Sequence, residues 1–548
     1  MVRRGYRIVA ADRFALVDSA TAALGADLRL AAPAGSVADI STFSPFAYRL
    51  YEEGLQLYYR DDAAGASRFF QAALREDSTF AMANYYAWIS ANPSGIDSVG
   101  DRAYRLASKA PERDRLIIMT VVEWHRGDPF ALVHADSLAA RFPNDPEALI
   151  AAARVWTFAS MTNGRAPALI NRVIALDSSA GATRTGICRL CYAFSLLASH
   201  FSWNDSLTGL DETVRRWKRL VPGDPHVWSV QATIALNTGG LEAAAAATRV
   251  EDSLRPTAVE RTPEDLVRWS LAAGDLDDAE RLCGAGSRVG TNRGSLRWVC
   301  TILLRYQGRY REANRLVIAG IWANKPSYAG LPPDQISRAT LDLETRRGHL
   351  AAQEFLEIAK PWRTYPVPGI AARNVAWNLT LAATAMAASG EWIQAAALAD
   401  TIEDVGKRSL YGRDPRLHFF IRGLLKAARG DHLGAVALYE KAAFSWTFGY
   451  TRINYELARS LLALHRPEDA IRPLQAALRG GIDGSNTYLS RTEVHELLGR
   501  AFAEAGQPDS AAAHYGQVVR AWAKADPEFR ARYQEALRHA TPATVKSD

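Results

Sequence analysis

The sequence predicts an all-α fold, an α-α superhelix built from about eleven to thirteen antiparallel helical pairs. Three observations carry this prediction. A short glycine-centred motif recurs at intervals of 34 to 41 residues, apolar residues follow each copy at helical spacing, and only residues 6–9 alternate as a strand would. The 548 residues therefore predict one long solenoid rather than three or four globular domains.

The first 45 residues precede the repeats. We expect a helix over residues 12–24 and then a linker that contains proline and glycine. Arg7 and Asp12 interrupt the apolar stretch that a signal peptide needs, and no window of 18 apolar residues predicts a membrane-spanning helix. We therefore expect a cytoplasmic protein without membrane insertion, or a periplasmic one if a membrane-anchored part lies upstream.

The recurring motif reads Gly, any residue, a large apolar residue, two polar residues, then Ala. Gly274–Ala279 and Gly308–Ala313 are two copies 34 residues apart. Glycine tolerates the left-handed conformation that ends a helix, and the alanine lets the next helix pack closely. Further copies, one with Asp in place of Gly, lie at residues 61–66, 239–244, 390–395, 430–435 and 506–511.

Bulky residues continue each second helix four and seven positions after the alanine. Tyr515 and Val518, for example, follow Ala511 in this way. One unit departs from the pattern, because aligning its turn on Gly348 puts Gln353 where alanine is expected.

Proline-rich connections divide the predicted array. Residues 324–333 and 361–368 contain several prolines, which end helices. We therefore expect five segments: an N-terminal helix and linker, a first array, an irregular joint, a second array, and a polar terminal helix with a tail. Their ranges are 1–45, 46–325, 326–375, 376–525 and 526–548.

These residue sizes at fixed offsets resemble the tetratricopeptide repeat, a 34-residue pair of antiparallel helices, over residues 46–538. The resemblance implies a scaffold for protein–protein interaction. Residues 42–54 and 75–81 also resemble the junction at which a TolB-like segment of large bacterial signalling proteins runs into such repeats. That second resemblance implies the alternative function, a regulatory or sensory repeat module, kinase-linked or transcriptional, whose output domain is absent from this chain.

The cysteine pattern leaves three interpretations open. Cys188 and Cys191 form a C-x-x-C, which is typical of half a zinc site, of a redox pair, or of two small residues buried in a helix. We favour the last, because zinc needs further ligands and a redox motif should accompany a βαβ unit. Cys283 and Cys300 are likewise expected to be small buried residues, so four cysteines do not predict a disulfide-stapled scaffold.

No catalytic or metal-binding constellation stands out. His495-Glu496 begins an H-E-x-x-H motif, but Gly499 takes the place of the second histidine. We therefore expect no enzyme activity, no metal and no cofactor. Most aromatic residues, including Trp217 and Trp392, are expected to pack in the core.

The net charge of +6 does not predict nucleic-acid binding. Only nine of the 65 basic residues are lysine, and they are interspersed with acidic residues rather than clustered. The densest basic run, residues 215–219, is expected to be a solvated helix face.

The expected binding surface is the concave groove, which the first helix of each pair lines. Arginine and aromatic residues are common interface hot spots, and arginine binds carboxylates through two parallel hydrogen bonds. We therefore expect a protein or peptide ligand, with an acidic or C-terminal peptide as one form. The candidate groove residues are Arg268, Trp298, Arg305, Trp377, Arg452, Tyr455, Arg459 and Arg500.

Overall fold

A computed structural model describes most of the chain. The described residues are Leu16, Ser19, Ala20, Ala23, Thr42, 44–60, 62–91, 98–159, 164–180, 188–237, 241–254, 262–288, 294–323, 333–447, 451–481 and 489–540. Most of the predicted helix over 12–24 and the alternating residues 6–9 lie outside them. Within these ranges the secondary structure is helical and contains no strand, as the sequence predicts.

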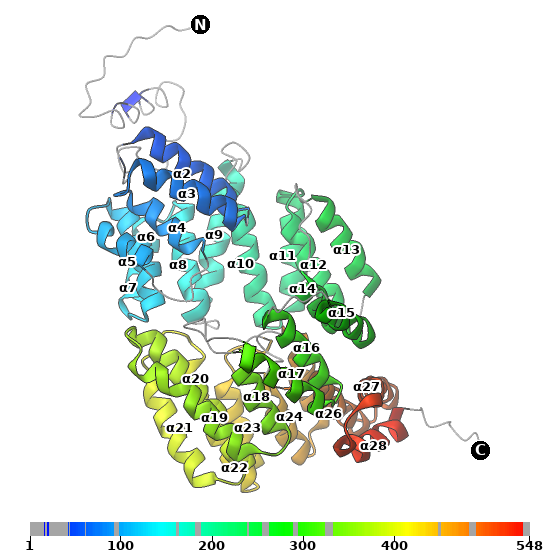
Figure 1. Ribbon diagram of the computed structural model, residues 1–548. Helices are drawn as coiled ribbons and strands as arrows, with labels where there is room; N and C mark the ends of the chain where they lie inside the picture. Colours follow the sequence, from blue (N-terminus) through cyan, green and yellow to red (C-terminus); the bar gives the residue numbers. More distant parts are fainter. Residues whose placement is uncertain are drawn as a thin grey trace. The chain divides into compact units, whose positions relative to one another are not determined.

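From residue 45 to residue 540, the described ranges contain thirteen helical pairs and one terminal helix (Figure 1). The pairs before the chain midpoint are α2 (Pro45–Tyr58) with α3 (Ala63–Glu76), α4 (Ala81–Ile89) with α5 (Ser98–Ala107), α6 (Glu112–Arg126) with α7 (Phe130–Arg141), α8 (Pro146–Ala159) with α9 (Arg165–Ala180), α10 (Arg189–Trp203) with α11 (Leu207–Leu220), and α12 (Pro225–Asn237) with α13 (Leu241–Leu254).

The later pairs are α14 (Pro263–Ala273) with α15 (Leu276–Arg288), α16 (Gly294–Tyr306) with α17 (Tyr310–Ala323), α18 (Pro333–Glu344) with α19 (Gly348–Ala359), α20 (Pro368–Ala388) with α21 (Trp392–Gly406), α22 (Leu417–Ala428) with α23 (His432–Ala442), α24 (Arg452–Ala463) with α25 (Pro467–Arg479), and α26 (Arg491–Glu504) with α27 (Pro508–Ala521). Short 3-10 helices are η2 (Lys360–Thr364), η3 (Asp414–Arg416), η5 (Trp522–Lys524) and η6 (Pro527–Phe529), and α28 (Arg530–Ala540) ends the described chain.

The chain forms two compact units. The first consists of residues 1–197 and 216–222, and the second of residues 198–215 and 223–548. Among the described residues, no helix is both long enough and apolar enough to cross a membrane.

Five predicted copies of the glycine motif form the turn inside their pairs, whereas the copies at 61–66 and 239–244 begin outside the described residues. Gly274, Gly308, Gly390, Gly430 and Gly506 adopt left-handed φ angles between 67° and 80°. The alanine five positions after each of them is at most 4% exposed. Each glycine therefore ends a first helix, and each alanine lies where the second helix meets its neighbours.

The alignment of the unit near Gly348 is wrong by two residues. Arg346 takes the left-handed position, with φ 61°, and Ala351 five residues later is fully buried. Gly348 is instead the first residue of α19, and Gln353 is exposed. The error arose because the turn residue here is not glycine, which also holds for His465, with φ 56°.

Three further glycines, each on the first helix of its pair, lie where the two helices pack against each other. Gly54, Gly423 and Gly499 each lie against an aromatic ring 16 residues later, Phe70, Tyr439 and Tyr515 respectively. A Cβ on these glycines would lie 2.5, 2.5 and 2.9 Å from the ring. The first helix therefore has no side chain where the second helix inserts its largest one.

The second unit has one continuous core over α17 to α28. It includes Ile336, Phe355, Trp362 and Ala372, which belong to the expected joint at 326–375. The 3-10 helix η2 replaces a regular helical end there, yet its Trp362 is buried. The helices around this joint thus pack into the same core as those that follow.

The terminal helix forms as predicted, but it is not a simple polar cap. The Asp526 amide donates to the carbonyl of Gly308 at 3.0 Å, and the Arg311 amide donates to the Asp526 carboxylate at 2.9 Å. Phe529 packs edge-on against Tyr310, with ring centroids 5.0 Å apart. The C-terminal segment is therefore docked on the α16–α17 pair.

The expectation of unpaired cysteines is wrong, although Cys191 and Cys300 are buried as predicted. Cys188 and Cys191 form a disulfide, as do Cys283 and Cys300. Cys188 precedes α10 rather than lying on a helical face, so its Cα can come within 5.4 Å of the Cα of Cys191. The other disulfide joins α15 to α16, with Cα atoms 5.9 Å apart.

Candidate functional site: a basic groove in the second unit

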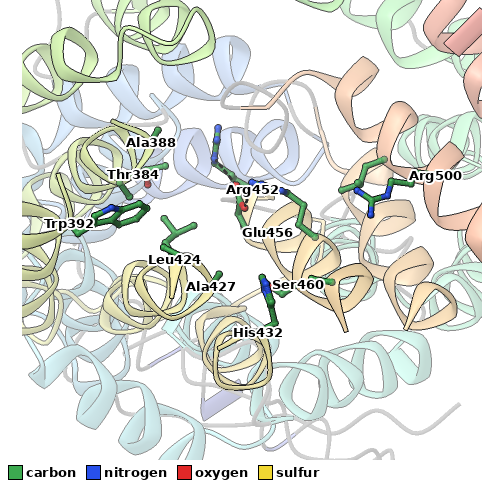
Figure 2. A pocket seen from close by; sticks show the side chains of 15 residues that line it. Thr384, Ala388, Trp392, Leu424, Ala427, His432, Arg452, Glu456, Ser460 and Arg500 are labelled. Atoms are coloured by element: carbon green, nitrogen blue, oxygen red, sulfur yellow. Dashed lines mark hydrogen bonds and ion pairs between the residues drawn. The ribbon is translucent and has the colours of Figure 1, made fainter. Parts of the chain in front are cut away.

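A cavity of about 460 Å³ opens on the inner face of four successive pairs in the second unit (Figure 2). Its walls come mainly from the first helices α20, α22, α24 and α26, with one residue each from α21 and α23. The lining residues are Thr384, Ala387, Ala388, Trp392, Leu424, Ala427, Ala428, His432, Arg452, Glu456, Arg459, Ser460, Ala463, Leu497 and Arg500.

One face of α24 forms the centre of the groove. Its lining residues Arg452, Glu456, Arg459, Ser460 and Ala463 recur at helical spacing, so all five lie on one side of the helix. The opposite side is apolar, with Leu457 and Leu461 buried in the core. The amphipathic pattern of α24 thus directs its charged face into the groove.

Glu456 organises the basic side chains of α24. It is only 6% exposed, and its carboxylate lies 2.9 Å from Nη1 of Arg459 and 3.7 Å from Nε of Arg452. The charge of Glu456 raises the pKa of Arg459. One carboxylate is therefore paired with two guanidinium groups, so the groove face of α24 has a net positive charge.

Arg500 extends the basic lining onto α26. Its Nε donates to Glu504 at 2.7 Å, and its side chain is 57% exposed. Arg459 has a similarly exposed side chain, at 59%. Both guanidinium groups are thus accessible to a ligand in the groove.

The other end of the groove is apolar. Trp392 and Leu424 lie at one side of the cavity in Figure 2, Arg500 lies at the other, and Arg452 with Glu456 lies between. The prediction that Trp392 packs in the core is wrong, because this residue is 40% exposed. It begins α21, two residues after the left-handed Gly390, and its side chain lines the cavity. Trp217, by contrast, is fully buried, as predicted.

The structure brings three of the eight predicted groove residues together, namely Arg452, Arg459 and Arg500. Tyr455 is on α24 as well, but it packs against the core, and burial raises its pKa. Trp377 is 6% exposed beneath the guanidinium of Arg413, 4.0 Å from its ring centroid. These two aromatic residues therefore do not line the cavity.

The remaining three predicted residues lie on α14 and α16. The Arg305 guanidinium is 2% exposed and donates to both carboxylate oxygens of Glu344, at 2.8 and 2.6 Å. Arg268 lies over the ring of Trp298, 5.8 Å from its centroid, and pairs with Asp265 at 3.2 Å. Arg305 thus joins two first helices, and the Arg268–Trp298 pair is separate from the cavity.

Sequence reasoning missed the acidic and apolar members of the lining. Glu456 and Ser460 could have been found, because they share the helical face of Arg452 and Arg459. Trp392, Leu424 and His432 could not, since their contribution depends on how neighbouring pairs stack.

Solved structures similar to this chain share its helical-repeat character. A tetratricopeptide repeat protein from Parabacteroides merdae is 15% identical, covers 51% of this chain and 98% of its own, and has a TM-score of 0.28. The Cut9–Hcn1 assembly of the APC/C is 12% identical, with coverages of 90% and 97% and a TM-score of 0.29. Yeast Tom70 is 13% identical, with coverages of 89% and 99% and a TM-score of 0.30.

These likenesses carry no argument about function, because identity is at most 15% and no TM-score exceeds 0.30. No family model matches the chain, and the comparison with curated proteins finds no relative. The solenoid fold therefore rests on the helical pairs and turns of the structure itself.

Proposed function

We propose that this protein is a non-catalytic helical-repeat scaffold that binds a protein or peptide partner in the groove of the second unit. The observation that carries the proposal is the cavity of about 460 Å³. Four successive first helices line it, and two of them, α24 and α26, contribute three arginines. Helical solenoids present extended concave surfaces of this kind to their partners.

The lining favours a ligand with a carboxylate and an apolar side chain. The side chains of Arg459 and Arg500 are exposed in the groove, and their planar guanidinium groups match the geometry of a carboxylate. Trp392 and Leu424 offer apolar surface at one side of the cavity (Figure 2). An acidic or C-terminal peptide segment meets both requirements.

The groove lacks the contact that nucleophilic catalysis needs. Ser460 and His432 both line the cavity, but no hydrogen bond joins them. A binding role is therefore the simpler interpretation of this set of side chains.

The test is affinity purification with mass spectrometry, which compares the unmodified chain with an Arg459→Gln/Arg500→Gln variant. We expect the variant to lose the main partner, because both accessible guanidinium groups are removed. Arg466→Gln is the matched control, since Arg466 is also exposed and paired with an aspartate, at 2.7 Å, but lies outside the groove. Equal recovery of the partner by the groove variant and the control would exclude the groove as the binding site.

We further propose that the protein works in an oxidising compartment, which favours the periplasmic alternative over the cytoplasm. All four cysteines are paired in the two disulfides. Such pairing is typical of proteins outside the reducing cytosol. Thiol titration of the denatured, unreduced protein from its native source should detect no free thiol, and four reactive thiols would contradict the proposal.

A further inference from the structure

A second cluster of unusual composition lies in the first unit. Four first helices bring Tyr58 of α2, Tyr85 of α4, Arg154 of α8 and Tyr192 of α10 together. The Tyr58 hydroxyl accepts a hydrogen bond from Nη1 of Arg154 at 3.2 Å, and the Tyr58 and Tyr192 ring centroids are 6.2 Å apart. Residues nearly 140 positions apart thus meet around one guanidinium group.

Arg154 differs from the other arginines nearby in having no carboxylate partner among the described residues. Arg113 contacts three acidic groups, Asp114 at 2.7 Å, Asp145 at 2.5 Å and Glu147 at 2.6 Å. Glu147 also lies 3.6 Å from Arg189. The local carboxylates therefore pair with other cations, and no described carboxylate neutralises the charge of Arg154.

A partly buried guanidinium group without a counter-charge is energetically unfavourable unless a bound anion supplies that charge. Arg154 is half-buried, and removing a cation from water without a counter-charge costs free energy. Its own partner is a neutral phenol, which accepts only one of the five hydrogen bonds that a guanidinium can donate.

The phenols around Arg154 are suited to donate hydrogen bonds to an anion. Burial raises the pKa of Tyr58 and of Tyr85, so both hydroxyls stay protonated near neutral pH. Tyr58, Tyr85 and Tyr192 are partly or fully buried, and their rings restrict the access of water to the guanidinium. A positive charge surrounded by hydroxyl donors recognises a group that carries negative charge on oxygen.

We propose that Arg154, Tyr58, Tyr85 and Tyr192 form an oxyanion-binding site, which takes a carboxylate or a phosphate group. The guanidinium binds two oxygens of the anion, and the Tyr85 and Tyr192 hydroxyls donate to the same group. This site lies in the first unit, whereas the proposed groove lies in the second. A test of one proposal therefore does not decide the other.

The test is isothermal titration calorimetry of the full chain in a chloride buffer, with sodium phosphate and sodium acetate as separate probes. We expect at least one probe to bind, and the stronger of the two identifies the preferred oxyanion. Arg154→Gln should weaken that binding roughly tenfold or more, because it removes a charge-assisted pair of hydrogen bonds. Arg172→Gln is the matched control, since Arg172 is an exposed arginine of the same unit that hydrogen-bonds only neutral groups, Pro143 and Asn144.

Two results would overturn the proposal: no binding of either probe by the unmodified chain, or equal binding by Arg154→Gln and the control. If circular dichroism shows that Arg154→Gln does not fold, Tyr85→Phe and Tyr192→Phe remove single hydroxyls and keep the rings. Each should weaken binding several-fold, and unchanged affinity in both variants would equally overturn the site.

Discussion

At the scale of single residues, the left-handed turn position distinguishes the repeats from one another. Seven described glycines adopt left-handed φ angles, whereas Asp205, Arg346 and His465 hold φ angles of 56°, 61° and 56° with a side chain present. A non-glycine residue in this region crowds its Cβ against the backbone, which costs about 1–2 kcal/mol. The turn therefore tolerates a side chain at a cost in stability.

This difference predicts that His465→Gly stabilises the second unit by about 1 kcal/mol. Gly430→Ala should destabilise it by a similar amount, since Gly430 has φ 80°. Urea unfolding followed by circular dichroism measures both changes. His465→Ala is the control for loss of the imidazole, because it removes the ring but keeps the Cβ. A gain in His465→Ala equal to that in His465→Gly would show that the backbone is not the cause.

A second residue-scale feature is a pair of neutral histidines. The Nδ1 atoms of His495 and His514 are 2.9 Å apart, so one ring donates and the other accepts. Burial lowers the pKa of His514 to about 4 and lowers that of His495, on which the positive charges of His514, Arg491 and Arg520 also act. Both rings therefore stay neutral in the folded protein at neutral pH.

The histidine pair predicts a loss of stability in mild acid. Unfolded histidines bind protons near pH 6.5, whereas folded His514 does so only near pH 4 and the pKa of folded His495 is also lowered, so the unfolded chain binds more protons as the pH falls from 6.5 toward 4. Stability should fall by about 1–3 kcal/mol as the pH falls through this window. In His514→Phe, whose ring can keep the stack on Phe502, urea midpoints should depend less on pH. Parallel pH profiles for the two proteins would contradict this assignment.

At the scale of elements, three pairs combine a glycine on the first helix with an aromatic residue on the second. Gly423 and Tyr439 show the tightest form of this arrangement, together with Gly54 and Phe70. The aromatic ring occupies the volume of the absent side chain, so the helices approach more closely than two ordinary side chains would allow.

Gly423→Ala should therefore destabilise the second unit by about 1–3 kcal/mol, because the new methyl group overlaps the Tyr439 ring. Unfolding midpoints in urea measure the loss. Gly516→Ala on α27 is the matched control, since nothing lies within 4 Å of its added Cβ, and it should be neutral or stabilising. Equal destabilisation by the two substitutions would show that the contact with Tyr439 is not responsible.

At the scale of the whole molecule, the second unit is tied together by contacts between helices far apart in sequence. The Arg311 guanidinium pairs with Glu528 at 2.7 Å, and Thr492 donates its hydroxyl to the carbonyl of Tyr306 at 2.7 Å. The Arg479 side chain likewise reaches Asp205 at 2.6 Å. A solenoid of nearest-neighbour contacts would lack these connections.

The docked C-terminal segment predicts a long-range effect of a single substitution. Phe529→Ala removes the ring that packs on Tyr310, so amide hydrogen exchange should accelerate in the α16–α17 turn, about 200 residues earlier in the chain. Mass spectrometry of peptides that cover residues 303–317 measures this change. Leu537→Ala, at an exposed position of α28, should leave their exchange unchanged. Unchanged exchange in Phe529→Ala would mean that this docking does not stabilise α17.

The sequence by itself determined the repeating pair. The spacing of glycine, alanine and bulky residues predicted the turns and the buried stripes, because both depend on interactions within a few helical turns. Of the eight residues predicted to share one groove, Arg452, Arg459 and Arg500 line the cavity, and the other five do not.

Only the tertiary structure decided what depends on stacking and on distant contacts. It buried Arg305 with Glu344, exposed Trp392 at the mouth of the groove, paired the four cysteines and docked Phe529 on Tyr310. It likewise brought Tyr58 and Tyr192 to Arg154. The physical reason is that a repeat motif encodes each pair and its neighbour, whereas the rotation between pairs accumulates along the array and has no local signature in the sequence.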